Sequence, residues 1–280
     1  MNKRKAELML VGVTIAWGTS YPLMKGTLED IAPLNLIALR FGLAFLVCFI
    51  VFFRRVFPVD RKTLLTSAAL GVLLSVVFAA LLFGMLTTRA TDAAFLSGIA
   101  VVFVPLLHMI VLRRLPAFPV ILGIIVTTLG IWLLNGGGSF HLAPGALLCM
   151  LCSLLYAVHI LLTQHFVQQH SSLQLGIYQL LFTALTAWLL SVLTESPVLP
   201  HGVKQWAVIW ALGLLCSAFG FVGQTLAQGF VSPERVAFIF TLEPVFTAVL
   251  SAIFLHELLG LAGYFGAFLI ICGVLLSGKE

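Results

Sequence analysis

Apolar residues fill this chain in long runs that short polar connections separate. Ten of these runs contain roughly 20 mostly apolar residues each, the length that a helix needs to cross a lipid bilayer. The runs cover about residues 7–26, 34–53, 64–85, 92–112, 118–135, 145–164, 173–193, 204–226, 234–255 and 260–277. Because the connections are short, consecutive helices must be antiparallel neighbours. The pattern predicts an all-α polytopic membrane protein with ten transmembrane helices.

Composition excludes an ordinary soluble domain. Of the 280 residues, 61% are hydrophobic and 9% are charged, with a mean hydropathy of +1.15. Soluble domains are about a quarter charged, so this chain has too few charges to cover a surface that faces water. In a membrane protein the net charge of +5 does not indicate nucleic acid, and no nucleic-acid partner is predicted. Cys149 and Cys152 have C-x-x-C spacing but no second ligand pair, so we interpret them as apolar packing and predict no metal and no cofactor.

The positions of the basic residues predict the orientation of the chain. If the N-terminus is cytoplasmic, three of the 15 basic residues lie at the outer side (Lys25, Arg89 and Lys204), and Arg40 lies within a span. The other eleven lie at the cytoplasmic side: Lys3, Arg4, Lys5, Arg54, Arg55, Arg61, Lys62, Arg113, Arg114, Arg235 and Lys279. We therefore expect a multi-pass protein with both termini in the cytoplasm. The first run lacks a small-x-small cleavage site and is interpreted as a permanent span.

The chain also repeats itself weakly. A shift of 139 residues aligns Arg40 with Gln179, and it overlays the first two runs on the sixth and seventh. A shift of 143 residues overlays the third to fifth runs on the eighth to tenth. Other aligned pairs are Trp17 with Tyr156, Phe78 with Phe221, and Gly130 with Gly273. These matches predict two five-helix halves, residues 1–138 and 139–280. Because five is odd, the second half must enter the membrane from the opposite face, which gives an inverted repeat.

The ninth run carries a carboxylate and a proline side by side, Glu243 and Pro244. An acidic residue at the centre of a span costs about 2.5–3.5 kcal/mol on insertion scales. One interpretation is a protonated carboxyl that hydrogen-bonds to a neighbouring helix. The other is a carboxylate that faces a cavity, where it contacts a substrate or carries a proton.

Prolines interrupt other runs in the same way. Pro22, Pro105 and Pro244 each lack a backbone N–H and free a carbonyl four residues earlier. Freed carbonyls at membrane depth are tolerated where they line a cavity or meet a side chain. Each proline is therefore a candidate helix break or gating point, and a simple packing kink is the alternative.

Arg40 lies about seven residues into the second run. It could extend its charge to the outer interface. It could instead pair with Asp30, Glu29 or Asp92 in an outer gate, or contribute to a cavity.

Polar and aromatic side chains recur at helical spacing on several runs. The candidates for a substrate cavity or for coupling are Trp17, Tyr21, Arg40, His108, Tyr156, His159, Gln179, Gln224 and Glu243. Hydrogen bonding between helices is the alternative explanation, and an isolated histidine such as His108 or His159 is more often a packing residue than a proton relay. The fifth and tenth runs are almost purely apolar and carry glycines seven apart. We expect these two runs to form a scaffold away from the cavity.

Four stretches give the chain a family resemblance: "AWGTSYPLMK", "LNLIALRF", "FIFTLEPVFTAVLSAIFLHELLG" and "GAFLIICGVLLS". They resemble EamA-like members of the drug/metabolite transporter superfamily, and the resemblance covers nearly the whole chain. Glu243 and Pro244 match the Glu-Pro of that family. The chain departs from the family in the fourth run, where Pro105 is displaced by four residues and Arg113-Arg114 replaces a Gly-Glu.

The resemblance implies secondary transport, usually efflux of amino acids or related small metabolites across a bacterial inner membrane. It also implies alternating access to a central site lined by spans 1–4 and 6–9. We expect a small-molecule substrate, contact with membrane lipid, and protons as a coupling ion. An uncoupled facilitator or importer is the main alternative. An integral membrane enzyme is the other, although the chain shows no H-E-x-x-H or G-x-S-x-G motif.

Overall fold

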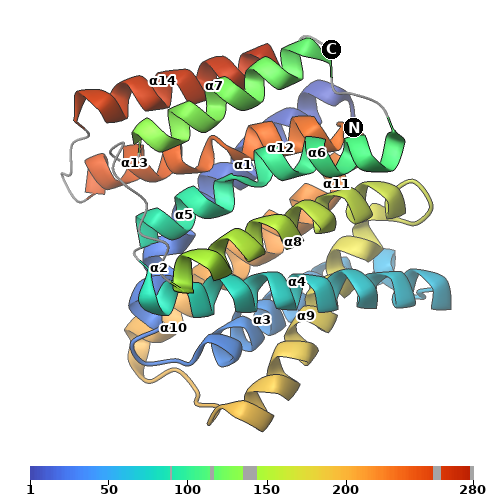
Figure 1. Ribbon diagram of the computed structural model, residues 1–280. Helices are drawn as coiled ribbons and strands as arrows, with labels where there is room; N and C mark the ends of the chain where they lie inside the picture. The colour runs from blue at the N-terminus through green and yellow to red at the C-terminus, as the bar shows by residue number, and fades with distance from the viewer. Residues whose placement is uncertain (89, 114–116, 135–143, 255–259, 278–280) are drawn as a thin grey trace.

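The computed structural model describes residues 1–88, 90–113, 117–134, 144–254 and 260–277. Within these ranges the chain consists of helices joined by turns and short irregular segments, with no β-strand (Figure 1). This agrees with the all-α class that the apolar pattern predicts. Of the basic residues that predict the orientation, Arg89, Arg114 and Lys279 lie outside the described residues.

Helices cover all ten predicted runs within the described part of the chain. They are α1 (Lys3–Gly18), α2 (Ser20–Thr27), α3 (Pro33–Val56), α4 (Arg61–Thr87), α5 (Ala90–Gly98), α6 (Ala100–Leu112), α7 (Phe118–Leu134), α8 (Pro144–Phe166), α9 (Ser172–Thr194), α10 (Gly202–Trp210), η1 (Ala211–Val222), α11 (Gly223–Gln228), α12 (Pro233–Phe240), α13 (Glu243–Phe254) and α14 (Leu261–Leu276).

Six segments of the described chain are long and apolar enough to cross a bilayer. They are Pro33–Val56, Arg61–Thr87, Asp92–Val111, Pro144–Phe166, Ser172–Thr194 and Gly202–Gln228. The helices α7 and α14 are shorter but also apolar. The first and ninth predicted runs are each divided into two helices, α1 with α2 and α12 with α13. The architecture is that of a multi-pass membrane protein, and the count of ten spans remains a prediction.

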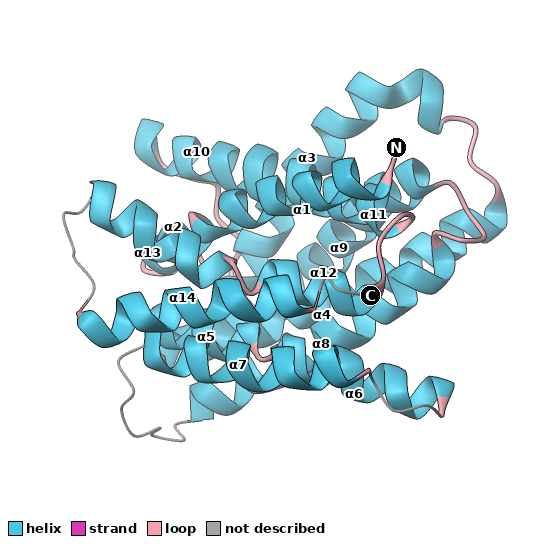
Figure 2. Cartoon of the chain, turned by 90° about the horizontal axis from the view of Figure 1, so that it is seen from above, coloured by secondary structure: helices cyan, strands magenta, loops and turns pink. Residues whose placement is uncertain are grey.

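The helices α7 and α14 pack side by side at one edge of the molecule in Figure 1, and Figure 2 looks down onto this pair. A Cβ atom built on Gly130 of α7 would lie 2.7 Å from the carbonyl oxygen of Gly266 in α14 and 2.8 Å from the amide nitrogen of Ile270. Only glycine permits backbones to approach this closely. This close contact fits the expectation that the two runs form a scaffold away from the cavity.

The long helices α3, α4, α8 and α9 pack against one another in the body of the molecule. The segment η1, which follows α10 without interruption, packs against α3 and α1. It is a π-helix, a wide helical form with i→i+5 hydrogen bonds that often occurs at functional sites. The indole N–H of Trp17 donates to the carbonyl of Cys216 in η1 at 2.8 Å. Gly220 makes this approach possible, because any Cβ there would overlap the indole ring.

Hydrogen bonds at the ends of the helices tie distant segments together. Arg235, in the first turn of α12, binds Glu7 near the start of α1 and Ser277 directly after α14. We call this side of the molecule the N-terminal face. At the opposite face, the carboxylate of Glu195 accepts from the amides of Leu34 and Asn35 at 3.0 and 2.9 Å. These two amides lie in the first turn of α3 and have no acceptor within the helix, so Glu195 caps α3 from the end of α9.

Candidate functional site

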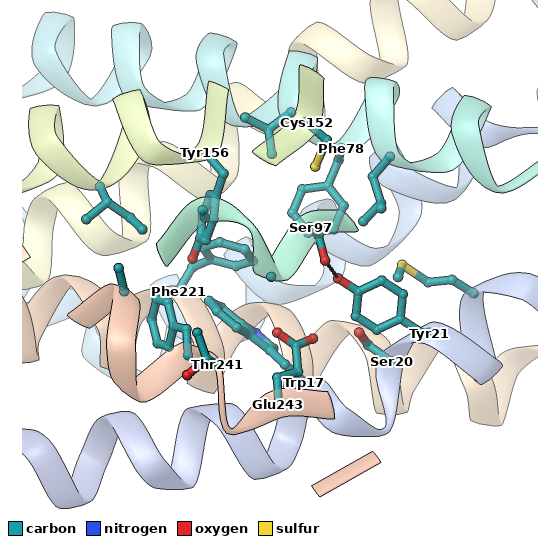
Figure 3. Close-up of a pocket in the computed structure, with 18 of the residues that line it drawn as sticks. Trp17, Ser20, Tyr21, Phe78, Ser97, Cys152, Tyr156, Phe221, Thr241 and Glu243 are labelled. Carbon is teal, nitrogen blue, oxygen red and sulfur yellow. Dashed lines mark hydrogen bonds between the residues drawn. The ribbon is translucent and has the colours of Figure 1, made fainter. Parts of the chain in front are cut away.

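A central cavity lies where several helices break. Its lining comes from α1, α2, α3, α4, α5, α6, α8, η1, α12 and α13, and it includes Thr241 between the last two. Among the described residues that line it, none belongs to α7 or α14. The free volume is about 70 Å³, which is room for a few water molecules. Both predicted halves of the chain therefore contribute to one cavity (Figure 3).

The helix breaks around the cavity lie close to two of the three predicted prolines. Thr19 separates α1 from α2, three residues before Pro22. Thr241 and Leu242 separate α12 from α13, immediately before Glu243 and Pro244. The ring of Pro22 is exposed, so this proline acts on the backbone and does not line the cavity.

The carbonyl of Gly18, which Pro22 leaves without its usual backbone donor, accepts a hydrogen bond from a side chain. The hydroxyl oxygen of Thr247 in α13 lies 3.0 Å from the carbonyl oxygen of Gly18 and 3.0 Å from that of Glu243. This contact joins the break in the first run to the break in the ninth. Pro105 differs, since it lies inside α6, six residues after the break at Ile99.

One wall of the cavity is aromatic. The ring of Trp17 lies 4.8 Å from that of Phe240, 5.1 Å from that of Phe221 and 6.1 Å from that of Tyr156, centroid to centroid. The Tyr156 hydroxyl donates to Gln224 at 2.9 Å. Aromatic rings supply large apolar contact surfaces with few rotatable bonds. This wall can therefore hold the apolar part of a small ligand.

Glu243 supplies the acidic group of the cavity. It is the first residue of α13, and Figure 3 shows its carboxylate directed into the space between Trp17 and Tyr21. Among the described residues, no donor forms a hydrogen bond with this carboxylate and no cation lies within 4.0 Å of it. Nearby, the hydroxyls of Tyr21 and Ser97 form a hydrogen bond of 2.5 Å. The carboxylate is thus available to a ligand or to a proton.

Arg40 supplies the cationic group. Its side chain is only 1% exposed, so it does not reach the outer interface. Its Nε–H donates to the Ser217 hydroxyl at 2.8 Å and its Nη1–H to the Met24 sulfur at 3.0 Å. The guanidinium carbon lies 4.8 Å from the ring centroid of Phe78. No carboxylate in the described part of the chain lies within 4.0 Å of it, so in this structure Arg40 does not form the pair with Asp30, Glu29 or Asp92 that the sequence allows as an alternative.

Three further predicted residues lie directly behind the cavity wall. The ring of His159 stacks on Tyr156 at 5.8 Å, and its Nε2 lies 3.1 Å from the Gln179 amide oxygen. The Gln179 amide nitrogen donates to Thr225 at 2.9 Å. Gln224 joins the network through Tyr156. These are the hydrogen bonds between helices that the sequence allows as an alternative, and they hold the aromatic wall in place.

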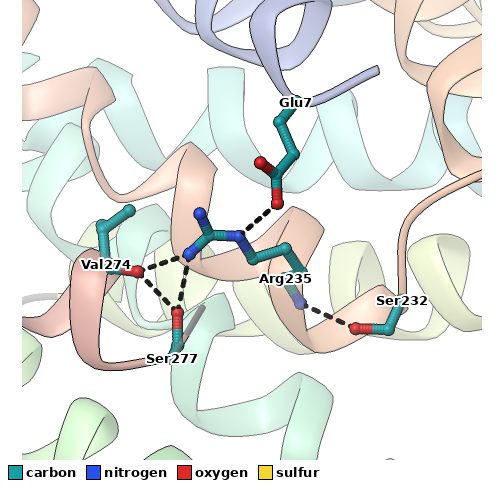
Figure 4. A network of polar contacts seen from close by, with 5 residues as sticks. All are labelled: Glu7, Ser232, Arg235, Val274 and Ser277. Carbon is teal, nitrogen blue, oxygen red and sulfur yellow. Dashed lines mark hydrogen bonds and ion pairs between the residues drawn. The ribbon is translucent and has the colours of Figure 1, made fainter. Parts of the chain in front are cut away.

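His108 lies away from the cavity, at the N-terminal face. Its Nδ1 contacts the carboxylate of Glu234 in the first turn of α12. The next residue, Arg235, donates from Nε to Glu7 at 2.8 Å and from Nη1 to Ser277 at 3.1 Å and to the carbonyl of Val274 (Figure 4). We refer to Glu7, His108, Glu234, Arg235 and Ser277 as the N-terminal-face network. It joins α1, α6, α12 and the end of α14.

The list of predicted site residues omits several residues of the lining, among them Phe78, Ser97, Cys152, Phe221 and Phe240. Phe221 lies three residues before Gln224, and Ser97 lies eleven residues before His108, so helical spacing places each on the same face as a predicted site residue. No such spacing identifies Phe78 and Phe240. An aromatic residue in an apolar run gives the same sequence pattern whether its side chain faces lipid or a cavity.

Comparison with known proteins identifies relatives over the full length of the chain. The model of the EamA-like transporter family matches residues 4–136 and 143–278. An uncharacterized transporter of Archaeoglobus fulgidus is 26% identical over 276 residues, which cover 97% of this chain and 85% of the relative. The uncharacterized transporter YyaM of Bacillus subtilis is 26% identical over 294 residues, which cover 99% of this chain and 94% of the relative.

A solved structure, titled only as the crystal structure of a protein, has the same fold. It superposes with a TM-score of 0.82 and covers 98% of this chain and 96% of its own. The sequence identity is 17%, so the likeness concerns the fold alone.

Proposed function

The chain belongs to the EamA-like transporter family, and on that premise we propose that it is a secondary transporter that exports a small metabolite, an amino acid or a related compound. It works by alternating access across the bacterial inner membrane, with both termini in the cytoplasm. The observation that carries this proposal is the central cavity at the helix breaks. It combines an aromatic wall with an acidic group that has no partner among the described residues.

The size of the cavity supports a mechanism in which helices move. Sites for small molecules usually measure about 300–1,000 Å³, whereas the free volume here is about 70 Å³. A metabolite therefore enters only if the helices around the cavity separate. The break at Thr241 lies in the wall itself, and the lining residues Trp17 and Ser20 flank the break at Thr19. Discontinuous helices of this kind typically form the substrate sites of secondary transporters, around which the two halves move.

Glu243 is the proposed coupling residue. A carboxylate inside the membrane is costly unless it has a partner or a proton. Glu243 can give up this proton to water or when a cationic group of the substrate binds beside it. The charge of the cavity then depends on whether the cavity is occupied. Because Glu243 opens α13 immediately after the break, a change in its charge acts on the segment that must move.

Flux in proteoliposomes tests the proposal. A panel of labelled amino acids and related metabolites is measured with and without an imposed proton gradient, for the wild type and for Glu243→Gln. The matched control is Glu29→Gln, which makes the same chemical change at an exposed position. We expect saturable, gradient-sensitive flux in the wild type and in the control, and loss of the gradient response in Glu243→Gln.

Two results would overturn parts of this proposal. Full gradient-driven flux in Glu243→Gln would remove the coupling role and leave Glu243 as a structural residue. Saturable flux that ignores the gradient in the wild type would indicate an uncoupled facilitator.

A further inference from the structure

Arg40 is a buried charge that the fold does not neutralise. Its side chain is 1% exposed and lines the central cavity. The described residues offer it one hydroxyl and one sulfur as acceptors, Ser217 and Met24. Sulfur is a weak acceptor, and a guanidinium carries five N–H donors. Two of those donors are therefore satisfied by neutral atoms, and the positive charge has no ion-pair partner in this part of the chain.

The residues around Arg40 hold its guanidinium in place without neutralising its charge. The guanidinium carbon lies over the rings of Phe78 and Phe41, at 4.8 and 5.2 Å from their centroids. Contacts of this kind attract a cation, but each is weak compared with the cost of removing an ion from water. The desolvation of a buried ion costs several kcal/mol. The rings and two neutral acceptors offset only a part of that cost, so an anion from outside the fold would stabilise this charge further.

The cavity is the place where such an anion can bind. Arg40 and the aromatic wall line the same space, so an anionic group at Arg40 puts the rest of a small ligand against Trp17 and Phe240. A guanidinium fork matches a carboxylate in two parallel hydrogen bonds. Glu243 lines the same space without contacting Arg40 within 4.0 Å, so a ligand can lie between the two charges once the helices around the cavity separate.

We propose that Arg40 binds the carboxylate of the transported substrate, so that the cavity selects small organic carboxylates over their neutral amides. This inference deepens the proposed function and rests on it, since it assigns one chemical group of the cargo to one residue. It does not depend on proton coupling or on the direction of transport.

The experiment compares each acid with its own amide. Leucine with leucinamide and phenylalanine with phenylalaninamide form pairs that share an apolar side chain and differ in the carboxylate. Two readouts are taken on purified protein: the thermal unfolding midpoint in detergent with each compound, and inhibition of labelled amino-acid exchange in proteoliposomes. We expect at least one acid to act at a concentration about tenfold or more below that of its amide, because hydrogen bonds to charged groups contribute roughly 1.5–3 kcal/mol.

Variants separate substrate binding from a structural role. Arg40→Gln should abolish the preference for the acid, and Arg40→Lys should keep a reduced preference, because lysine retains the charge without the planar fork. Ser217→Ala removes a structural acceptor of Arg40 and should lower the unfolding midpoint while the preference persists. If Arg40→Gln does not fold, Arg40→Lys still reports the preference.

The outcomes separate this inference from the proposed function. Exchange in the wild type with equal response to every acid and its amide would refute the role of Arg40 and leave transport standing. Stabilisation by an acid but not by its amide, without any flux, would support Arg40 and refute transport. An unchanged preference for the acid in a folded Arg40→Gln variant would also overturn the inference.

Discussion

Two regions of this molecule each contain an arginine and a glutamate from distant helices. In one region the two charges form an ion pair, and in the other they do not. In the N-terminal-face network, Arg235 and Glu7 form an ion pair of 2.8 Å, with side chains 14% and 26% exposed. In the central cavity, Arg40 and Glu243 line one space, yet neither has an ion-pair partner within 4.0 Å among the described residues. The paired charges hold helices together, whereas the unpaired charges of the cavity are the ones to which we assign a role in ligand binding and coupling.

The two regions are connected through one segment of the chain. Helix α12 carries Glu234 and Arg235 in its first turn and ends at Phe240, which belongs to the cavity wall. The break that follows leads directly to Glu243. A movement that separates α12 from α1 at the N-terminal face therefore also displaces the aromatic and acidic lining of the cavity. The alternating access that we propose requires a link of this kind between an opening at one face and the site.

The largest expected effect comes from giving Arg40 an ion-pair partner within the protein, as Arg235 has in the N-terminal-face network. Ser217→Asp places a carboxylate where the Ser217 hydroxyl now accepts from Arg40 at 2.8 Å. The new carboxylate pairs with the guanidinium of Arg40, which is then no longer free to bind a substrate. The rate of carboxylate exchange should therefore fall by about a hundredfold, the equivalent of roughly 2.7 kcal/mol. Labelled amino-acid exchange in proteoliposomes measures it.

Ser217→Asn is the matched control for this change, because it adds nearly the same volume without the charge. It should retain much more exchange than Ser217→Asp. Equal activity of the two variants would show that the charge of Arg40 is not what the substrate uses.

A smaller effect is expected from breaking the pair in the N-terminal-face network. Arg235→Gln removes the charge that Glu7 faces and the donors to Ser277 and to the carbonyl of Val274. Because the pair is partly exposed, we expect the free energy of unfolding to fall by about 1–2 kcal/mol. Chemical unfolding in detergent measures this loss.

The charge-exchanged double variant, Glu7→Arg with Arg235→Glu, tests whether the pair itself matters. It should recover part of the stability that the two single variants lose. The preference for an acid over its amide should not change in Arg235→Gln. A change in that preference as large as the one expected for Arg40→Gln would mean that the network and the cavity do not have separate roles.

Much of the fold follows from the sequence, because hydrophobic length and backbone chemistry act locally. The apolar runs predict where the helices lie, and the glycines seven apart indicate that the fifth and tenth runs can approach another helix closely. A missing N–H at Pro22 and Pro244 predicts breaks in these runs, and the helices do divide close to both prolines. The inverted relation of the two halves stays a prediction.

The details of the site do not follow from the sequence, because they depend on contacts between distant segments. Arg40 and its acceptor Ser217 are 177 residues apart, and nothing local indicates that a hydroxyl and a sulfur replace the expected carboxylate. His108 shows a similar limit. Helical spacing places it on a polar stripe, but its position near the end of α6 brings it to Glu234, 126 residues away.

The smallest expected effect comes from removing the charge of Asp60, which lies in water beside the N-terminal face. Asp60 is exposed and caps α4, since its carboxylate accepts from the Thr63 amide at 2.9 Å and from the Thr63 hydroxyl at 2.5 Å. These hydrogen bonds lower the pKa of Asp60, the one to the Thr63 side chain most of all. A lowered pKa in the folded state means that the ionised form stabilises the fold.

The contribution of Asp60 is therefore complete above the pKa of an unfolded aspartate, about 3.9, and is lost as the pH falls through the lower folded value. Asp60→Asn keeps a capping oxygen but removes the charge. Its unfolding midpoint should lie slightly below that of the wild type at pH 6, and the two should converge as the pH falls below about 4. Thr63→Val, which removes the hydroxyl donor, should reduce the same difference. A gap between Asp60→Asn and wild type that stays constant from pH 6 to pH 3 would show that this charge contributes nothing, in contrast to those of the cavity and the network.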